Sequence, residues 1–257
     1  PSEVMKLALV VYLAMVVSKL KDDINKVGSI IAYVVIVGIA AGIVGVLQSN
    51  LSTALLLVAI AGSILYVSRV KKRWLTVLAA LGMVLAVSAV VFVPYRMQRV
   101  QTYLSGEQRD IFGEGYQVQQ NLIAVGSGGL FGVGLGQSRQ KFNYIPEATS
   151  DSIFAVYAEE VGFVGVLLFV SLSTLLILRS LYWARVIHDE YGKFVIVGVM
   201  TWFSAQLFLN VGATISVIPL TGVPLPFVSY GSSSLIVLFA AFGLVANITR
   251  FVPKKVS

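Results

Sequence analysis

The sequence contains no cysteine and a single histidine, and only 12% of its 257 residues are charged. Without cysteine there can be no disulfide, no thiolate metal site and no cysteine nucleophile. So few charges do not fit an ordinary soluble globular domain. What the chain has instead is apolar surface: 57% of the residues are hydrophobic and the mean hydropathy is +0.87. This composition is typical of an integral membrane protein.

Long apolar runs divide the chain into segments that can cross a bilayer, which takes about 20 helical residues. Seven such runs are present, at residues 2–17, 27–47, 51–68, 75–93, 152–178, 194–211 and 228–248. The third follows Gln48-Ser49-Asn50 without a real loop, which indicates a broken or tightly turned helix. We therefore expect an all-α polytopic membrane protein with seven transmembrane helices, forming one domain over residues 1–257.

Positive charge is concentrated in alternate connections between these runs. Thirteen of the 19 Lys and Arg residues lie there: Lys19, Lys21, Lys26, Arg69, Lys71, Lys72, Arg73, Arg179, Arg185, Lys193, Arg250, Lys254 and Lys255. The positive-inside rule assigns these connections to the cytoplasm, so the net charge of +7 reports membrane topology and not nucleic-acid binding. The long loop at residues 94–150 is then extracytoplasmic. His188 falls on the cytoplasmic side, which excludes a Ser-His-Asp triad at an outward-facing site.

The outer loop is far longer than ordinary connections, and such loops are usually functional or disordered. Residues 116–125 predict an amphipathic helix, with Val118, Leu122 and Val125 on one face, that lies on the membrane surface or lines a cavity. The glycine-rich loop that follows, residues 126–138, holds six glycines. A dinucleotide-binding loop would need a preceding strand within a βαβ unit. We therefore interpret the glycines as sites of close backbone packing in a compact re-entrant loop.

Asp151 follows the outer loop, where the chain enters an apolar helix. A carboxylate at the rim of a membrane helix is costly to keep there, so it indicates a functional site by default. We expect Thr149 or Ser150 to cap this helix and to put Asp151 in its first turn, where the helix dipole favours the ionised carboxylate. The alternative is an ordinary helix N-terminal carboxylate, which is common on any helix.

Two stretches resemble the SEDS proteins of bacterial shape, elongation, division and sporulation, with the FtsW branch most similar and RodA next. They are GYQVQQNLIAVGSGGLFGVGLGQSRQKFNYIPEATSDSIFAVYAEEVGFVG at residues 115–165 and IPLTGVPLPFVSYGSSS at residues 218–234. The opening PSEVMKLAL is also similar to a family motif. The resemblance implies a fold of about ten membrane helices, so about three N-terminal helices would be missing here. With the charge pattern, it implies a multi-pass protein of the bacterial cell membrane whose active site faces outward.

SEDS proteins polymerise peptidoglycan glycan strands from lipid II together with a class B penicillin-binding protein, a transpeptidase. The resemblance therefore implies lipid II, the growing glycan strand and that transpeptidase as partners, besides membrane lipid. The family's essential aspartate matches Asp151 by motif. Residues 149–152 read Thr-Ser-Asp-Ser where the family has His-Thr-Asp-Phe, and residues 48–53 read Gln-Ser-Asn-Leu-Ser-Thr where it has Gln-Pro-Asp-x-Gly-Thr. The second departure removes a carboxylate from an outer turn, so no function is carried onto that turn.

The chemistry implied by the resemblance needs little machinery. Diphosphate is a good leaving group when cations hold it, so glycosyl transfer from a lipid diphosphate needs no general acid. What remains is one base that takes the proton of the attacking sugar hydroxyl, and we predict that Asp151 is this base. A Mg²⁺ ion bridging Asp151 and the diphosphate would be chemically sensible, although no ligand cluster in the sequence requires a cofactor.

Five further residues are predicted to bind substrate: Glu3, Lys6, Arg99, Lys141 and Glu147. Glu3 and Lys6 stand three apart on one helix face and can pair. Lys6 either holds a diphosphate or forms a simple helix-end ion pair and snorkels to the interface. Arg99 and Lys141 either clamp phosphate oxygens or anchor the chain at the interface. Glu147, four residues before Asp151, is a candidate partner of that carboxylate or a cation ligand.

Two other functions fit the same composition. One is a transporter that moves lipid II across the bilayer, because broken helices and the intramembrane residues Glu159 and Glu160 would suit it. We expect these two glutamates to be structural, with partners such as Gln206 or Asn210. The other is a non-catalytic scaffold that recruits the transpeptidase. Alternating access requires a site near the bilayer midplane, whereas the candidate charges cluster at one face, so polymerisation is the leading interpretation.

Overall fold

The structure is a computed structural model that describes residues 2–93, 97, 100, 103, 114–138 and 151–250. In these residues it is all-α, as predicted. The helices are α1 (Ser2–Leu20), α2 (Val27–Gly42), α3 (Leu51–Val67), α4 (Lys72–Val91), α6 (Glu114–Ser127), α7 (Ile153–Val186), α8 (Glu190–Thr214) and α9 (Ser232–Arg250). A 3₁₀ turn, Lys21–Asn25, follows α1, and a π turn, Ile43–Leu47, ends α2. All seven predicted membrane segments are helical, and the predicted amphipathic helix is α6.

Five helices within the described residues are long and apolar enough to cross a membrane: α2 with its π turn, α4, α7, α8 and α9. Helix α3 is shorter, and α1 carries three charged side chains. The tight turn predicted before α3 is present, and Asn50 caps the helix because its Oδ1 accepts a hydrogen bond from the Thr53 N–H at 2.9 Å. Asparagine and aspartate are equivalent at such a position, so the missing carboxylate leaves the turn intact.

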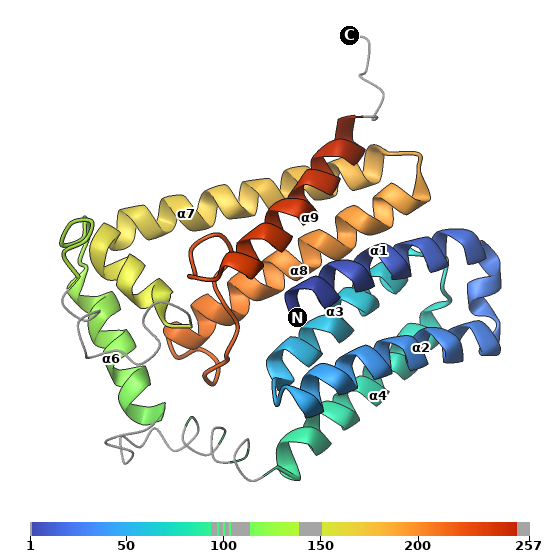
Figure 1. Cartoon of the computed structure of the whole chain (residues 1–257), viewed down its shortest axis with the longest axis horizontal. Coiled ribbons are helices and arrows are strands. Elements are labelled where there is room, and N and C mark those ends of the chain that lie inside the picture. The colour runs from blue at the N-terminus through green and yellow to red at the C-terminus, as the bar shows by residue number, and fades with distance from the viewer. Residues whose placement is uncertain are drawn as a thin grey trace. The chain divides into compact units, whose positions relative to one another are not determined.

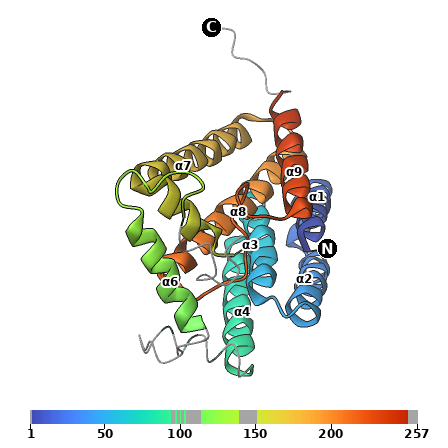
Figure 2. The ribbon, with the colours of Figure 1, turned by 60° about the vertical axis from the view of Figure 1, so that its left-hand side comes forward.

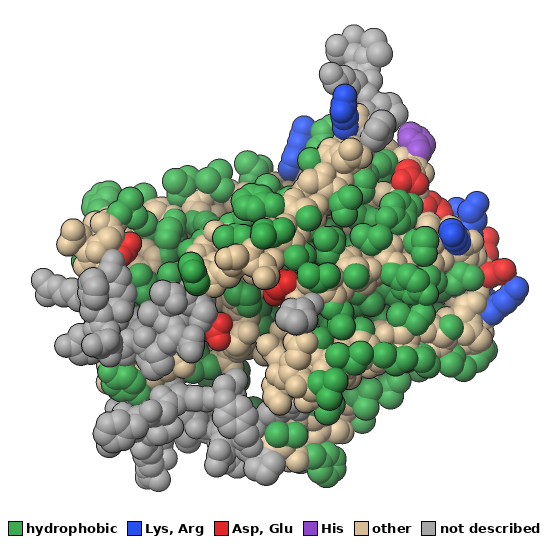
Figure 3. Space-filling view, in the orientation of Figure 1, with side chains coloured by type: hydrophobic (Ala, Val, Ile, Leu, Met, Phe, Trp, Pro, Cys, Tyr) green, Lys and Arg blue, Asp and Glu red, His purple; other side chains and the backbone are tan. Residues whose placement is uncertain are grey.

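The chain divides into two compact units. The first comprises Pro1–Val87, Leu176–Ala205 and Ser232–Ser257, and in it α1, α2 and α3 lie side by side with α9 against α1. Its polar connections meet at one end, where Arg69 contacts Asp22 and Glu190 and the Asn25 amide bonds the backbone of Arg69 and Lys71. Figure 3 shows charged side chains gathered at this end and apolar side chains over the helices.

The second unit comprises Ser88–Leu175 and Gln206–Gly231. Its helix α7 is broken at Gly162, which has φ 66° and ψ −173°. This region of backbone conformation is essentially restricted to glycine. At the break, the N–H groups of Phe163 and Val164 lose the carbonyls of Glu159 and Glu160 that a regular helix would give them.

The glycine-rich loop supplies new partners for these two N–H groups and for the carbonyls of Glu159 and Glu160. The exchange consists of four backbone hydrogen bonds of 2.9–3.1 Å: Phe163 N–H to Gly129 C=O, Val164 N–H to Leu130 C=O, Val133 N–H to Glu159 C=O and Gly134 N–H to Glu160 C=O. Irregular backbone is tolerated at a membrane only where protein satisfies it in this way. Close backbone packing, predicted from the glycines, is therefore confirmed.

The exchange requires glycine on both sides of the contact. A methyl group on Gly132 would overlap the carbonyl oxygen of Glu160, and one on Gly162 would overlap the Gly132 nitrogen. Gly132 also has φ +81°. By contrast, a methyl group on Gly126, in the last turns of α6, would meet no atom within 4 Å. The glycines of one short segment thus differ sharply in what they allow.

Replacing Gly162 or Gly132 with alanine should therefore destabilise the protein. We expect each to lower the free energy of unfolding by about 1–3 kcal/mol, because the backbone is strained and the four exchanged bonds are displaced. Gly126→Ala is the matched control and should cause no loss, since alanine is favoured over glycine in a helix by about 1 kcal/mol. Thermal unfolding in detergent measures the difference. Equal melting temperatures for all three variants would contradict the exchange.

Candidate active site around Asp151

Asp151 lies in the second unit, half-buried, two residues before helix α7. The prediction that it lies in the first helical turn is wrong, because the helix begins at Ile153 and the Ala155 N–H already donates to the Ser152 carbonyl. The predicted caps, Thr149 and Ser150, lie outside the described residues. Asp151 therefore belongs to the connection that precedes α7, and the position of its carboxylate is set by that connection and not by the helix.

The amide of Asn210 fixes the backbone of Asp151. Asn210, on α8, is buried, and its Nδ2 donates to the carbonyls of both Asp151 and Val223 at 2.9 Å each. One side chain thus ties together the start of α7, the end of α8 and the irregular segment at residues 215–231. Within the described part of the chain its Oδ1 is buried without a hydrogen-bond partner, and its two recorded bonds both run from Nδ2 to backbone carbonyls.

Gly222 lies directly against the Asp151 carboxylate. A methyl group on Gly222 would stand 3.4 Å from Oδ2 of Asp151. Segment 215–231, which holds this glycine, is not helical, and hydrogen bonds within it and from α8 fix its backbone. Ser229 Oγ accepts from the Leu225 N–H at 2.7 Å, and Gln206 on α8 donates to the Pro224 carbonyl at 3.5 Å. A fixed wall of backbone therefore lines one side of the carboxylate.

Helix α6 packs on the other side of this connection (Figure 1). Gln117 donates to the Ser152 hydroxyl at 2.9 Å, next to Asp151 in the chain. One and two turns further along α6, Asn121 and Ala124 are buried, and Ala124 packs against Ala155 of α7. The segment that carries Asp151 is thus held by three side-chain or packing contacts from elements that are distant in sequence.

The glutamates at the α7 break have structural partners. Glu159 is buried and accepts a hydrogen bond from the Ser138 hydroxyl at 2.5 Å, and the Ser138 N–H lies 3.4 Å from Glu160 Oε1. Ser138 ends the glycine-rich loop, so these bonds fasten the loop at a second point. These bonds to Ser138 agree with the structural role expected for both glutamates. Asn210, one of the expected partners, donates instead to two backbone carbonyls.

Lys6 and Glu3 lie in the first unit and form the predicted ion pair. Lys6 Nζ is 2.6 Å from Glu3 Oε1 and 4.9 Å from the centre of the Trp202 ring. The Lys6 side chain is 1% exposed and that of Glu3 is 15% exposed. Snorkelling of Lys6 is therefore ruled out, because its ammonium group lies inside the helix bundle. The pair itself lies within α1, and the contact of the Lys6 ammonium with the Trp202 ring links α1 to α8.

Three of the predicted substrate-binding residues, Arg99, Lys141 and Glu147, lie outside the described residues. Their roles stay predictions, as does a bridging Mg²⁺ ion. Within the part of the chain that is described, no three acidic or histidine side chains cluster as a metal site would require.

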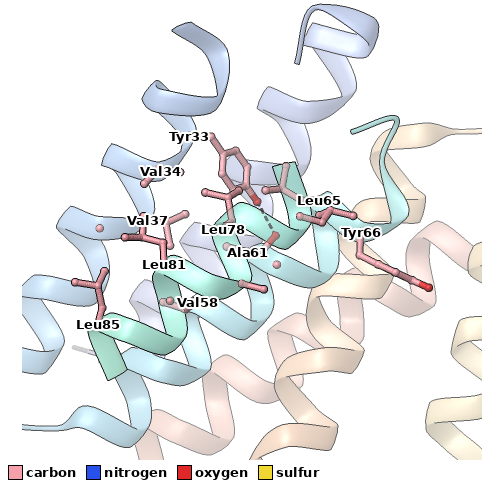
Figure 4. A pocket seen from close by; sticks show the side chains of 15 residues that line it. Tyr33, Val34, Val37, Val58, Ala61, Leu65, Tyr66, Leu78, Leu81 and Leu85 are labelled. Carbon is pink, nitrogen blue, oxygen red and sulfur yellow. Dashed lines mark hydrogen bonds between the residues drawn. The ribbon is translucent and has the colours of Figure 1, made fainter. Parts of the chain in front are cut away.

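The two cavities with defined linings are apolar and differ in kind from the Asp151 site. One, in the first unit, has a volume of about 360 Å³ and lies between α2, α3 and α4 (Figure 4). Its only side-chain hydroxyl that bonds within the lining is that of Tyr33, which donates to the Ala61 carbonyl. The other, about 340 Å³, is lined in the second unit by Phe154, Ala158, Val211 and neighbouring apolar residues. Neither lining contains a charged residue, so neither cavity offers a side-chain cation to a diphosphate.

Comparison with known proteins agrees with this architecture. A family profile described as "Cell cycle protein", which groups FtsW, RodA and SpoVE, matches residues 1–254. The chain belongs to this family. It is 38% identical to the stage V sporulation protein E of Bacillus subtilis, over 98% of this chain and 68% of that protein. It is 37% identical to a protein of Aliivibrio salmonicida named probable peptidoglycan glycosyltransferase FtsW, over 96% of this chain and 62% of that protein.

Solved structures of the family share the fold. A chain from the structure described as "Structural coordination of polymerization and crosslinking by a peptidoglycan synthase complex" superposes with a TM-score of 0.75 at 28% identity, over 97% of this chain and 69% of that one. The rod shape determining protein RodA of Thermus thermophilus superposes with a TM-score of 0.65 at 25% identity, over 99% and 67%. The chain spans about two thirds of the length of the curated relatives it matches.

Two residues of the site were not predicted from the sequence, Gly222 and Gln117. Both lie within stretches that resemble the family, but neither carries a charge or a reactive group that would mark it. Gly222 lies between prolines in its segment, and Gln117 is one of several polar residues of the amphipathic helix, so neither stands out in the sequence. Their roles come from three-dimensional proximity to Asp151 and Ser152.

Replacing one member of the Lys6–Glu3 ion pair should destabilise the protein more than replacing both members. We expect Lys6→Met to lower the free energy of unfolding by about 1–3 kcal/mol, because it leaves the partly buried Glu3 carboxylate without its cation. The double variant Lys6→Met/Glu3→Gln should recover most of this loss. Thermal unfolding in detergent of both single variants and the double variant gives the coupling. Additive effects would show that the two side chains do not depend on each other.

Proposed function

We propose that this protein extends peptidoglycan glycan strands by transferring a glycosyl group from a lipid-linked diphosphate donor to lipid II. Its membership of the FtsW, RodA and SpoVE family supports this proposal, as does the name peptidoglycan glycosyltransferase carried by several relatives. The observation that carries it is the placement of Asp151. Its half-buried carboxylate lies against Gly222, on a backbone that Asn210 holds.

In the proposed step, the Asp151 carboxylate takes the proton of the acceptor hydroxyl. The oxygen so freed attacks the anomeric carbon of the donor, and the bond from that carbon to the diphosphate oxygen breaks. The lipid diphosphate leaves with the electron pair of that bond and needs no proton. A single displacement of this kind inverts the anomeric configuration and requires one base only.

The surroundings of Asp151 suit a base. Asn210 holds the Asp151 backbone and Gln117 holds Ser152, so the two amides position the segment that carries the carboxylate. Glycine at position 222 leaves free the space in which a side chain would stand against Oδ2. Arg99 and Lys141 are the proposed cations for the diphosphate, because arginine binds phosphate oxygens through two parallel hydrogen bonds and lysine as a point charge.

Polymerisation fits the distribution of buried charge better than transport does. Among the described residues the buried ionisable side chains are Lys6 and Glu159, apart from buried tyrosine. Both lie in the first two turns of their helices and both have partners. A transporter site is expected near the bilayer midplane, between the ends of broken helices.

We place the protein in the bacterial cell membrane as a multi-pass protein, with the Asp151 site facing outward. The basic connections at the opposite ends of the helices support this orientation through the positive-inside rule. A class B penicillin-binding protein is the proposed partner, since one structural relative belongs to a complex that couples polymerization and crosslinking.

Asp151→Asn tests the proposal. With labelled lipid II in detergent, the variant should form polymer at least about 100-fold more slowly than the unmodified protein, because a general base contributes about 10²–10⁴ in rate. Its melting temperature should be unchanged. Asp22→Asn, a change of the same kind at an exposed carboxylate in the first unit, should keep full activity. The assay should use the full-length protein with its transpeptidase, and polymer formed by Asp151→Asn at the normal rate would refute the role of this residue.

A further inference from the structure

Helix α6 turns polar residues toward the protein and exposes apolar residues, whereas a helix on a water-soluble domain does the reverse. Its polar residues Gln117 and Asn121 face the protein, where Gln117 bonds Ser152 and Asn121 is 1% exposed. Its apolar residues Leu122 and Ile123 are exposed. A helix that buries amides and exposes aliphatic side chains is not stable against water, so this surface needs an apolar environment.

The glycine-rich loop continues the same pattern beyond α6. Its outward side chains are Leu130, Phe131, Val133 and Leu135, and Phe131 and Leu135 are 80% and 78% exposed. The loop contacts α7 through backbone hydrogen bonds, so these four side chains are not needed for that contact and point outward. The loop is thus held rigidly while its largest apolar groups project from the protein.

This surface adjoins the lipid-facing side of α7. The loop bonds the backbone of Phe163 and Val164, whose side chains are also exposed, and the exposed residues Leu167 and Leu168 follow one turn later. The apolar run from Phe163 continues without a charged residue to Leu178, while Glu159 and Glu160 stand just before it. The break at Gly162 therefore marks the boundary between the apolar span and the polar end of α7, and the loop lies at that boundary.

We propose that α6 and the glycine-rich loop form an interfacial membrane anchor, with the exposed apolar side chains of residues 122–135 inserted into the bilayer beside α7. No residue from Gly115 to Ser138 is charged, so insertion of this segment buries no formal charge, and its exposed amides, Gln119 and Gln137, remain among the lipid head groups. Segments of this kind bury their apolar face in the boundary between head groups and acyl chains. The anchor holds Ser152, and with it Asp151, at the level of lipid head groups.

The bilayer accounts for this surface better than a partner protein does. Its exposed side chains are aliphatic or phenylalanine, whereas protein interfaces are enriched in Trp, Tyr and Arg at their centres. The surface is also continuous with the lipid-facing residues of α7 through the backbone exchange. The inference does not depend on the proposed catalytic activity.

Residues 1–257 contain no cysteine, so single cysteines can be introduced there for a direct test once any cysteine elsewhere in the full-length protein is replaced by serine. Single cysteines at Phe131, Leu135, Leu168 and Asp22 are to be spin-labelled, and the full-length protein reconstituted in phosphatidylcholine–phosphatidylglycerol vesicles. Collision of each label with molecular oxygen, which concentrates in lipid, and with a water-soluble nickel chelate is then measured. Phe131→Cys and Leu135→Cys should resemble Leu168→Cys on the span, with high oxygen and low nickel accessibility. Asp22→Cys, at an exposed loop, should show the reverse.

Two outcomes would overturn the anchor. Labels at positions 131 and 135 that behave like the label at Asp22 would place the loop in water. Labels shielded from both reagents would show a protein contact in place of lipid. The labelled proteins should elute as the unlabelled protein does in size-exclusion chromatography, which shows that they are folded. Because activity is not the readout, failure of the anchor and failure of the proposed catalysis are distinguishable.

Discussion

Four backbone hydrogen bonds between the glycine-rich loop and the broken helix α7 are the contact on which the second unit depends. A helix cannot simply break beside a bilayer, because the freed N–H and C=O groups would have no partners. Here the loop takes the place of the missing helical turn, and Gly132 and Gly162 allow the two backbones to touch. This contact fixes α6 against α7, and α6 in turn holds the connection that carries Asp151.

Within the described residues, backbone and neutral side chains position the Asp151 carboxylate. Asn210 holds the chain on one side, Gln117 holds it on the other, and Gly222 leaves room at the carboxylate itself. This arrangement suits a reaction in which the substrate brings its own good leaving group. The buried charges elsewhere, Lys6 and Glu159, are engaged with Glu3 and Ser138 and have a structural role in this account.

The features that depend on residue type along the chain could be predicted from the sequence. Apolar runs located seven helices, the polar residues 48–50 located the turn that Asn50 caps, and the glycines indicated close backbone packing. Features that depend on distant residues could not be predicted. One such feature is the start of α7 at Ile153, and another is the burial of Lys6 against Trp202. Both depend on packing between helices, which no local sequence pattern indicates. The same holds for Asn210, whose two bonds reach Asp151, 59 residues earlier in the chain, and Val223, 13 residues later.

The most direct test of the central claim is a structure of the full-length Asp151→Asn protein with a lipid-linked diphosphate donor and an acceptor both bound. The account predicts that the acceptor hydroxyl lies within about 2.6–3.2 Å of the side chain at position 151, on the side opposite the diphosphate. An acceptor hydroxyl that lies out of reach of this side chain, with a different group at hydrogen-bond distance, would contradict the account.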